Sequence, residues 1–279
     1  MMLSTANIEL RDSHVMAIVN VTPDSFYSGS RNTSEEGVER RIERAIAEGA
    51  TIVDIGGYST RPNAPEVSLE EEWARVRCGL RAVAKVDAGV VVSIDSFRAE
   101  IIRRAVEEFG EVIVNDISAG EQDDAMLGMV AKYRLPYIAM HMRGTPQTMQ
   151  SLTEYDKGVV HGVVEYFRRR VEDIVKAGVE RDKIVLDPGF GFAKSMEQNY
   201  ELLRDLDALR ALGYPLLIGL SRKSMIYKPL GITPEESLPG SLALAWEALR
   251  GGNAILRVHD VWETVQILRL NNIYRNDRG

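Results

Sequence analysis

The stretch MAIVNVTPDSF, residues 16–26, joins an apolar run of strand type to a polar loop. The run stops at Asn20, and a rigid proline, an aspartate and a serine precede Phe26. A strand that only supports a core can end on any polar turn, whereas this one ends on hydrogen-bonding side chains. The fold and the function therefore depend on whether other strands of the chain end in the same way.

Seven further β-branched runs of similar length occur along the chain. They are TIVDIGG (51–57), VVVSID (90–95), VIVND (112–116), PYIAMHM (136–142), KIVLDPG (183–189), PLLIGLS (215–221) and NAILRVH (253–259), and they follow HVMAIVN (14–20). Most of the eight are continuously apolar rather than alternating. This pattern is typical of strands that are buried on both faces of a parallel sheet.

Segments of helical periodicity lie between these runs. Three open with capping boxes and three end at a glycine. The boxes pair Thr33 with Glu36, Ser68 with Glu71 and Thr233 with Glu236, and the glycines are Gly49, Gly178 and Gly213. Eight β-then-α units predict an α/β protein with one domain, residues 1–279, folded as a single (β/α)₈ TIM barrel. Residues 1–13 would form a flap at the barrel bottom.

A doubly wound open sheet is the alternative architecture. It is disfavoured because no G-x-G-x-x-G turn follows the first strand. The composition also restricts the function: a net charge of -7 argues against a nucleic-acid surface, and the single cysteine excludes a disulfide within the chain. The N-terminus lacks a secretory signal pattern, and no apolar run approaches the roughly 18 residues of a membrane span. We therefore expect a cytoplasmic protein without membrane partners.

Polar side chains follow every predicted strand, where barrel enzymes place their active sites. They are Asn20, Thr60, Arg61, Asp95, Asn115, Asp116, His141, Asp187, Ser221, Arg222, Lys223, Arg257 and His259. A single aspartate of this kind is usually a helix cap, and a single cation is usually a solvated surface charge. Those explanations weaken because they must hold independently at eight ends. The set favours a ligand with N–H donors, an anionic group and a planar ring.

Eight segments, in order along the chain, resemble the dihydropteroate synthase family. They are NVTPDSF, DIGGYSTRP, SIDS, VNDISAG, MHMRGTPQTMQ, LDPGFGF, GLSRKSMI and RVHDV, and the resemblance runs from about residue 14 to residue 265. It implies condensation of 6-hydroxymethyl-7,8-dihydropterin diphosphate with 4-aminobenzoate, which gives 7,8-dihydropteroate and diphosphate in folate biosynthesis. It also implies a Mg²⁺ cofactor, a homodimer and a target for sulfonamides.

The resemblance also assigns residues to each ligand. The pterin would be bound by Asp95, Asn115, Asp187, Lys223 and Arg257, of which Asp95, Lys223 and Arg257 would be catalytic. The aminobenzoate would contact Phe26, Thr60, Arg61, Pro62, Phe192 and Ser221. The diphosphate would meet Asn20, Arg61, Arg257 and His259, and Asn20 would also contact the metal ion.

The sequence departs from the family pattern in its loops, and two other functions stay open. Tyr58 stands at a usually acidic position, and Ser28, Ser30, Asn63, Ala193 and Tyr227 replace other typical residues, several of them glycines. A pterin-binding methyltransferase barrel would share the Asp and Asn contacts but would not need the STRP, SRKS and RVHD segments. A catalytically silent pterin-binding protein would be expected to lose some of five charged or amide residues. All five remain here: Asn20, Arg61, Asp95, Lys223 and Arg257.

Overall fold

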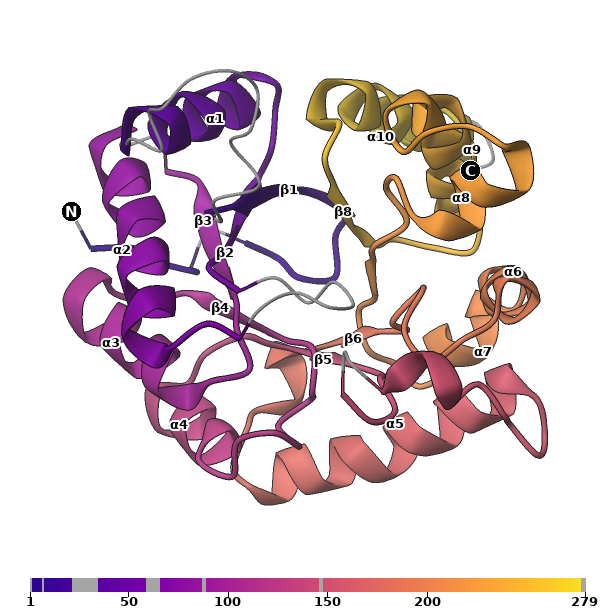
Figure 1. Cartoon of the computed structure of the whole chain (residues 1–279), viewed down its shortest axis with the longest axis horizontal. Coiled ribbons are helices and arrows are strands. Elements are labelled where there is room, and N and C mark those ends of the chain that lie inside the picture. Colours follow the sequence, from indigo (N-terminus) through magenta and orange to yellow (C-terminus); the bar gives the residue numbers. More distant parts are fainter. Residues whose placement is uncertain are drawn as a thin grey trace.

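Eight parallel strands alternate with helices around a common axis, which confirms the predicted (β/α)₈ TIM barrel (Figure 1). The computed structural model describes residues 2–6, 8–21, 35–58, 66–86, 89–145 and 148–276. The strands are β1 His14–Asn20, β2 Ile52–Gly56, β3 Val91–Asp95, β4 Ile113–Asp116, β5 Tyr137–Met140, β6 Ile184–Asp187, β7 Leu217–Ile218 and β8 Ile255–Val258. Each lies within a run predicted from the sequence.

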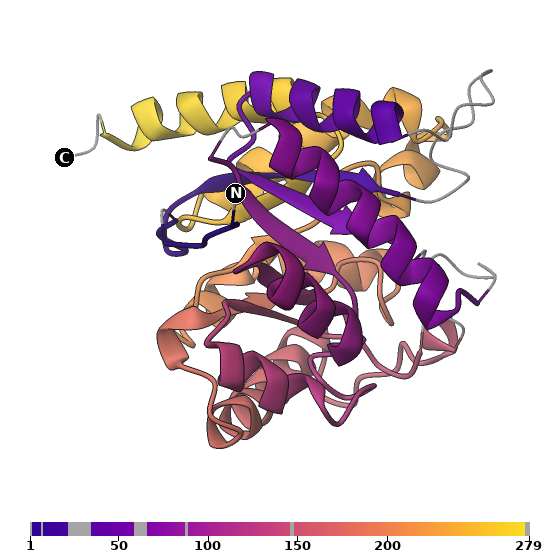
Figure 2. The ribbon, with the colours of Figure 1, turned by 90° about the vertical axis from the view of Figure 1, so that its left-hand side faces the viewer.

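Ten α-helices are described, and they surround the strands (Figures 1 and 2). They are α1 Glu35–Ala47, α2 Leu69–Val86, α3 Ala99–Phe109, α4 Met126–Tyr133, α5 Val159–Lys176, α6 Met196–Arg204, α7 Leu206–Arg210, α8 Ser224–Leu230, α9 Leu238–Leu249 and α10 Val261–Asn276. Gly49, Gly178 and Gly213 follow helices with φ of 101°, 102° and 82°, as expected of helix-ending glycines. In this part of the chain no helix is long and apolar enough to cross a membrane.

The predicted helix starts have different outcomes. Ser68 accepts a hydrogen bond from the Glu71 N–H at 3.2 Å just before α2, whereas Thr33 lies outside the described residues. The Thr233–Glu236 box forms in both directions, at 2.9 and 3.3 Å, but it precedes a 3₁₀ turn, and α9 begins only at Leu238. Pro239 has no N–H to donate, so a regular α-helix cannot continue through it from Pro234.

The barrel is nearly closed. The strand order is β6-β5-β4-β3-β2-β1-β8-β7, and β6 meets β7 through one isolated bridge between Leu186 and Leu216. There the Leu186 N–H donates to the Pro215 carbonyl at 2.9 Å. Pro215 offers no donor in return, which limits the ladder at this seam.

One apolar layer fills the barrel interior and supports the site above it. It takes one side chain from every strand: Met16, Ile52, Val91, Ile113, Ile138, Val185, Leu217 and Ile255. Leu10 and Ile8, from the segment before β1, pack against this layer. Because strand side chains alternate, the residues two positions further along face the same interior. Those residues include Asp54, Ser93, Asn115, Asp187 and Arg257, so a polar layer lies directly above the apolar one.

Candidate active site

Arg257 lies between two carboxylates at the centre of the polar layer. Its Nε donates to Oδ2 of Asp54 at 2.6 Å, and its Nη2 donates to Oδ2 of Asp95 at 2.7 Å. Burial opposes the charge of the guanidinium, but the two carboxylates together hold its pKa above the ordinary value. Burial raises the pKa of Asp95 to about 7, against the attraction of Arg257 and with the repulsion of Asp54.

Asn115 joins the same cluster from β4. Its Nδ2 donates to Oδ2 of Asp54 at 3.1 Å, and both side chains are buried. Strand register places Asp95 beside Asn115, so the two reach the rim from neighbouring strands.

Sequence patterns did not select Asp54, because it stands inside the apolar run of β2 rather than after it. The period-two pattern could have selected it, since Asp54 follows the interior residue Ile52 by two positions.

Asp187 and Lys223 follow β6 and β7, on either side of the barrel seam. Oδ1 of Asp187 accepts the Gly189 N–H at 2.8 Å, and burial raises the pKa of this carboxyl group. Lys223 donates to the carbonyl of Phe190, and its Nζ lies 4.8 Å from the centre of the Phe192 ring. Burial lowers the pKa of Lys223 to about 8, against the attraction of Asp187.

Ser221 and His259 connect the ends of β7 and β8. The Ser221 Oγ lies 3.1 Å from Nδ1 of His259 and also accepts the His259 backbone N–H at 3.2 Å. Burial lowers the pKa of His259 to about 4, and Arg257 and Arg222 add to the shift. His259 is therefore neutral at pH 7 and offers a ring without charge to this end of the site.

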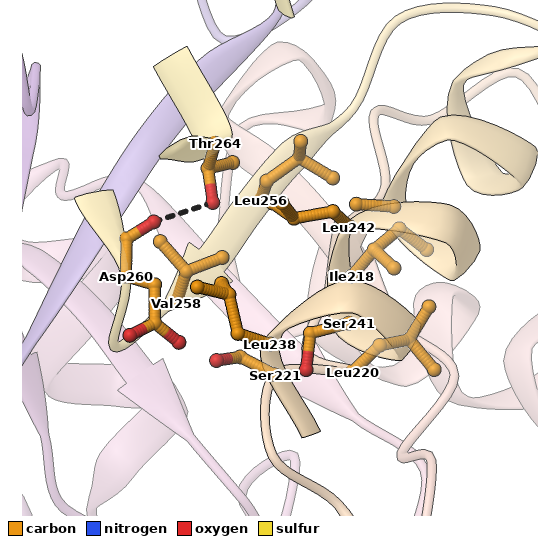
Figure 3. A pocket seen from close by; sticks show the side chains of 11 residues that line it. Ile218, Leu220, Ser221, Leu238, Ser241, Leu242, Leu256, Val258, Asp260 and Thr264 are labelled. Atoms are coloured by element: carbon orange, nitrogen blue, oxygen red, sulfur yellow. Dashed lines mark hydrogen bonds between the residues drawn. The ribbon is translucent and has the colours of Figure 1, made fainter. Parts of the chain in front are cut away.

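The turn that contains Ser221 is stabilised by contacts of the next residue, Arg222. Arg222 has a left-handed backbone with φ of 56°, its N–H donates to the Ser241 Oγ at 3.0 Å, and its guanidinium pairs with Asp260. A cavity of about 10 Å³ lies behind this turn, lined mainly by apolar side chains such as Leu256 and by Ser221 (Figure 3). It is the size of a single water molecule, so it cannot hold a substrate.

Asn20 faces Asp95 across a glycine. A Cβ built on Gly56 would lie 3.2 Å from Oδ1 of Asn20 and 3.6 Å from Cβ of Asp95, so the absence of a side chain keeps this gap open. The described ranges contain no group of three or more His, Cys, Asp or Glu residues arranged to hold a metal ion. Oδ1 of Asn20, at the edge of this gap, is an oxygen that could bind a metal ion.

A buried lysine that the sequence analysis did not select supports the loop after β6. Lys194 is 4% exposed, and its Nζ lies 3.0 Å from the carbonyl oxygens of Gly189 and Phe192 and from Nδ1 of His141. Burial lowers its pKa to about 7, against the attraction of Asp187. His141, selected as a strand-end residue, contacts this lysine and the ring of Tyr166 rather than the polar centre.

The structure thus brings most of the predicted pterin residues onto one rim, through contacts that involve Asp54. The predicted residues Phe26, Thr60, Arg61 and Pro62 lie outside the described residues, as do Ser28, Ser30 and Asn63. Ala193, at a position where the family usually has glycine, has a left-handed backbone with φ of 50°. Tyr58 lies edge-on to the Phe97 ring at 5.4 Å between ring centres.

A barrel that gathers carboxylates, an amide and cations at one rim suits an enzyme that binds a pterin, because the pterin edge carries N–H donors. The family model described as pterin binding enzyme matches residues 16–259. The chain belongs to this family and, within it, to the dihydropteroate synthases.

Relatives of known activity and structure agree. The dihydropteroate synthase of Escherichia coli K12 is 43% identical over 95% of this chain and 92% of its own. The Yersinia pestis dihydropteroate synthase, solved with a sulfonamide drug complex, has a TM-score of 0.90 and 38% identity over 99% of this chain and all of its own. The Xanthomonas albilineans enzyme with 4-aminobenzoic acid has a TM-score of 0.87 and 40% identity, covering 95% of this chain and 94% of its own.

Proposed function

We propose that the chain condenses 6-hydroxymethyl-7,8-dihydropterin diphosphate with 4-aminobenzoate, releasing 7,8-dihydropteroate and diphosphate. The observation that supports this function most is that Asp95, Asn115 and Arg257 lie together at the rim of the barrel. The chain that contains them is 43% identical to a dihydropteroate synthase. A second Xanthomonas albilineans structure contains 7,8-dihydropteroate, the product of this reaction. The reaction belongs to folate biosynthesis, and sulfonamides are expected to compete for the aminobenzoate site.

The pterin site would be formed by Asp95, Asn115, Asp187, Lys223 and Arg257. The pterin presents a guanine-like edge of N–H donors, which carboxylate and amide oxygens accept. Lys223 would donate to the ring carbonyl, and the planar guanidinium of Arg257 would stack on the ring. All five residues are buried or half-buried, which supports this assignment, because charge-assisted hydrogen bonds are stronger where water is largely excluded.

The aminobenzoate would lie against Phe192, with its carboxylate near Ser221. The Arg222 N–H already donates to Ser241, so this backbone group would not bind the carboxylate. Phe26, Thr60, Arg61 and Pro62 complete this proposed site from segments outside the described residues. The cation of Lys223, which lies over the Phe192 ring, would border both ligands.

The diphosphate would meet Asn20, Arg61, Arg257 and His259, with Mg²⁺ held in part by the Asn20 amide oxygen. Mg²⁺ usually keeps several waters and binds through few protein oxygens together with substrate phosphates, which fits a single ligand beside an open gap. When bound, the ion neutralises charge on the leaving diphosphate. His259 is held neutral by its surroundings, so it would donate a hydrogen bond rather than a charge.

The proposed mechanism begins with loosening of the exocyclic C–O bond. The electron-rich dihydropterin shares the positive charge that develops, and the ionised carboxylate of Asp95 stabilises it. The neutral aromatic amine then attacks the carbon. No strong base is needed, because the proton leaves a product ammonium that is already acidic. Arg257 would contact the diphosphate as the negative charge on it grows.

Release of diphosphate on mixing both substrates with Mg²⁺ tests the function. A dihydropteroate synthase releases diphosphate and forms dihydropteroate in equal amounts. A pterin-binding methyltransferase barrel would instead act on methyltetrahydrofolate with a corrinoid partner and release none. A silent pterin-binding protein would bind the pterin without any turnover. We further propose that the enzyme acts in the cytoplasm as a homodimer, without membrane or nucleic-acid partners.

A further inference from the structure

Asp54 is a fully buried carboxylate one layer beneath the strand ends. It is 0% exposed, and its register partner on β3 is Ser93, whereas the partner of Asp95 on β2 is Gly56. A ligand that approaches the rim of the barrel therefore reaches Asp95 before it reaches Asp54. Asp54 belongs to the site through the side chains it holds rather than through a contact with substrate.

One oxygen of Asp54 receives both neighbouring donors. Its Oδ2 accepts Nε of Arg257 at 2.6 Å and Nδ2 of Asn115 at 3.1 Å. An ionised carboxylate only accepts hydrogen bonds, so Asn115 must direct its amide nitrogen toward Asp54. The Asn115 amide oxygen is then directed away from Asp54 and is oriented to accept from an N–H donor of the ligand.

Arg257 is held at one end by Asp54 and at the other by Asp95. The contact to Asp54 uses Nε, next to the aliphatic part of the side chain, and the contact to Asp95 uses the terminal Nη2. In the proposed function Asp95 accepts from the pterin, and Arg257 meets the diphosphate. The Nη2 contact is the one that must change, whereas the Nε contact can persist.

We propose that Asp54 is the positioning residue of the pterin site: it fixes the orientation of the Asn115 amide and anchors Arg257 through Nε, so that Nη2 can exchange Asp95 for the substrate's diphosphate. This role rests on the proposed function. The role explains why a carboxylate is buried at this position. A buried carboxylate strongly destabilises the protein when it loses its partner. Asp54 would therefore retain Arg257 whether or not substrate is bound.

The same layer of the barrel provides a matched control. Oδ1 of Asp54 and Oγ of Ser93 are both buried without a hydrogen-bond partner among the described residues. Ser93 is as deeply buried as Asp54 and lies beside it in the register, but it holds neither Arg257 nor Asn115. Ser93→Ala therefore tests disturbance of the layer without loss of the two contacts.

The test compares Asp54→Asn, Asp54→Ala and Ser93→Ala in the full-length enzyme. For the Asp54 variants we expect the KM of the pterin diphosphate to rise and the affinity for inorganic diphosphate to fall, each by about 10- to 100-fold, as for loss of a charged hydrogen-bond partner. The KM of aminobenzoate should stay within about twofold, and the nearly isosteric Asn variant should be milder than Ala. Ser93→Ala should behave as wild type. Unchanged pterin and diphosphate binding in a folded Asp54→Asn enzyme would overturn the proposal.

A measurement on the wild-type enzyme covers the case in which the Asp54 variants do not fold. The ¹⁵N-labelled Nε–H signal of Arg257, assigned with Arg257→Lys, should keep its shift and its protection from exchange when inorganic diphosphate is added. A large shift or loss of protection would mean that Asp54 releases the guanidinium, and the inference fails. Absence of wild-type turnover would instead contradict the proposed function.

Discussion

Lys194 places its ammonium nitrogen 3.0 Å from Nδ1 of His141 and equally close to the carbonyl oxygens of Gly189 and Phe192. An ammonium group has three donors, and these are three acceptors. His141 has a pKa well below its ordinary value, because burial and the nearby lysine disfavour its charge, so its Nδ1 is free to accept. A buried cation thus ties the loop that presents Phe192 to the end of β5.

We predict that this lysine makes stability depend on pH. Its pKa is about 7 in the folded protein and 10.5 when exposed, so the unfolded chain binds more protons between these values. The free energy of unfolding of wild type, relative to Lys194→Met, should then rise with pH from about 7 to 10.5, by roughly 1 kcal/mol per pH unit. The difference should level off below pH 7. Urea titrations at several pH values measure it, and a pH-independent difference would contradict the prediction.

Replacement of Asp95 should remove the acidic limb of the rate profile. The carboxylate is the active form, and its pKa is raised to about 7, so wild-type kcat/KM should fall below that pH. Asp95→Asn should lower kcat by roughly 100-fold or more, as for loss of a group that stabilises charge in the transition state. The remaining kcat/KM of this variant should no longer fall below about pH 7. Diphosphate release measures both quantities. Near wild-type turnover in the folded variant would refute the assignment.

Weakening the support of the Ser221 turn should affect aminobenzoate more than pterin. Asp260 holds the Arg222 guanidinium at 2.5 and 3.0 Å, behind a backbone with positive φ. Asp260→Asn should raise the KM of aminobenzoate by about fivefold, corresponding to roughly 1 kcal/mol for a partly exposed ion pair. The exposed pair of Arg250 and Glu247 provides the control, and Arg250→Gln should change neither KM. Equal effects on both substrates would show that the turn serves the whole rim.

Removal of Mg²⁺ should affect the diphosphate half of the substrate alone. With EDTA present, turnover should fall by at least about tenfold and return on addition of Mg²⁺, since a bound cation stabilises the leaving oxyanion. Binding of 6-hydroxymethylpterin, which lacks the diphosphate, should be unchanged in a calorimetric titration. Full activity after exhaustive chelation would remove the metal from the proposed mechanism.

The proposed homodimer has a specific surface to test. Trp262, Leu270, Ile273 and Tyr274 on α10 are 51%, 55%, 63% and 49% exposed, so this helix carries several large apolar side chains at the surface. Ile273→Asp should convert a dimer to a monomer in sedimentation, because a buried unpaired charge destabilises an interface. Leu230→Asp is the control, since Leu230 is 62% exposed but lies on α8. A dimer that tolerates Ile273→Asp would place the interface elsewhere.

Much of the site follows from single positions in the sequence. Asn20, Asp95, Asn115 and Asp187 each follow a mainly apolar run, and a parallel barrel brings the ends of such runs to one rim. The sequence pattern did not identify two other residues of the site and its support. Asp54 stands within a strand and Lys194 follows a loop motif, so neither has the pattern of a strand-end residue. The start of α9 was also misplaced, because Pro239 lies beyond the predicted capping box.

The sequence by itself determined the alternation of strands and helices, the family and the chemical groups at the rim, because apolar periodicity and local motifs are properties of neighbouring residues. The tertiary structure decided which of these groups are hydrogen-bonded to one another. Asp54 and Arg257 are separated by most of the chain, yet the strand order β2-β1-β8 of the barrel brings their side chains to 2.6 Å from each other. Burial at the rim above that layer then shifts the pKa values of Asp95, Lys223 and His259, since desolvation depends on surroundings that no local pattern contains.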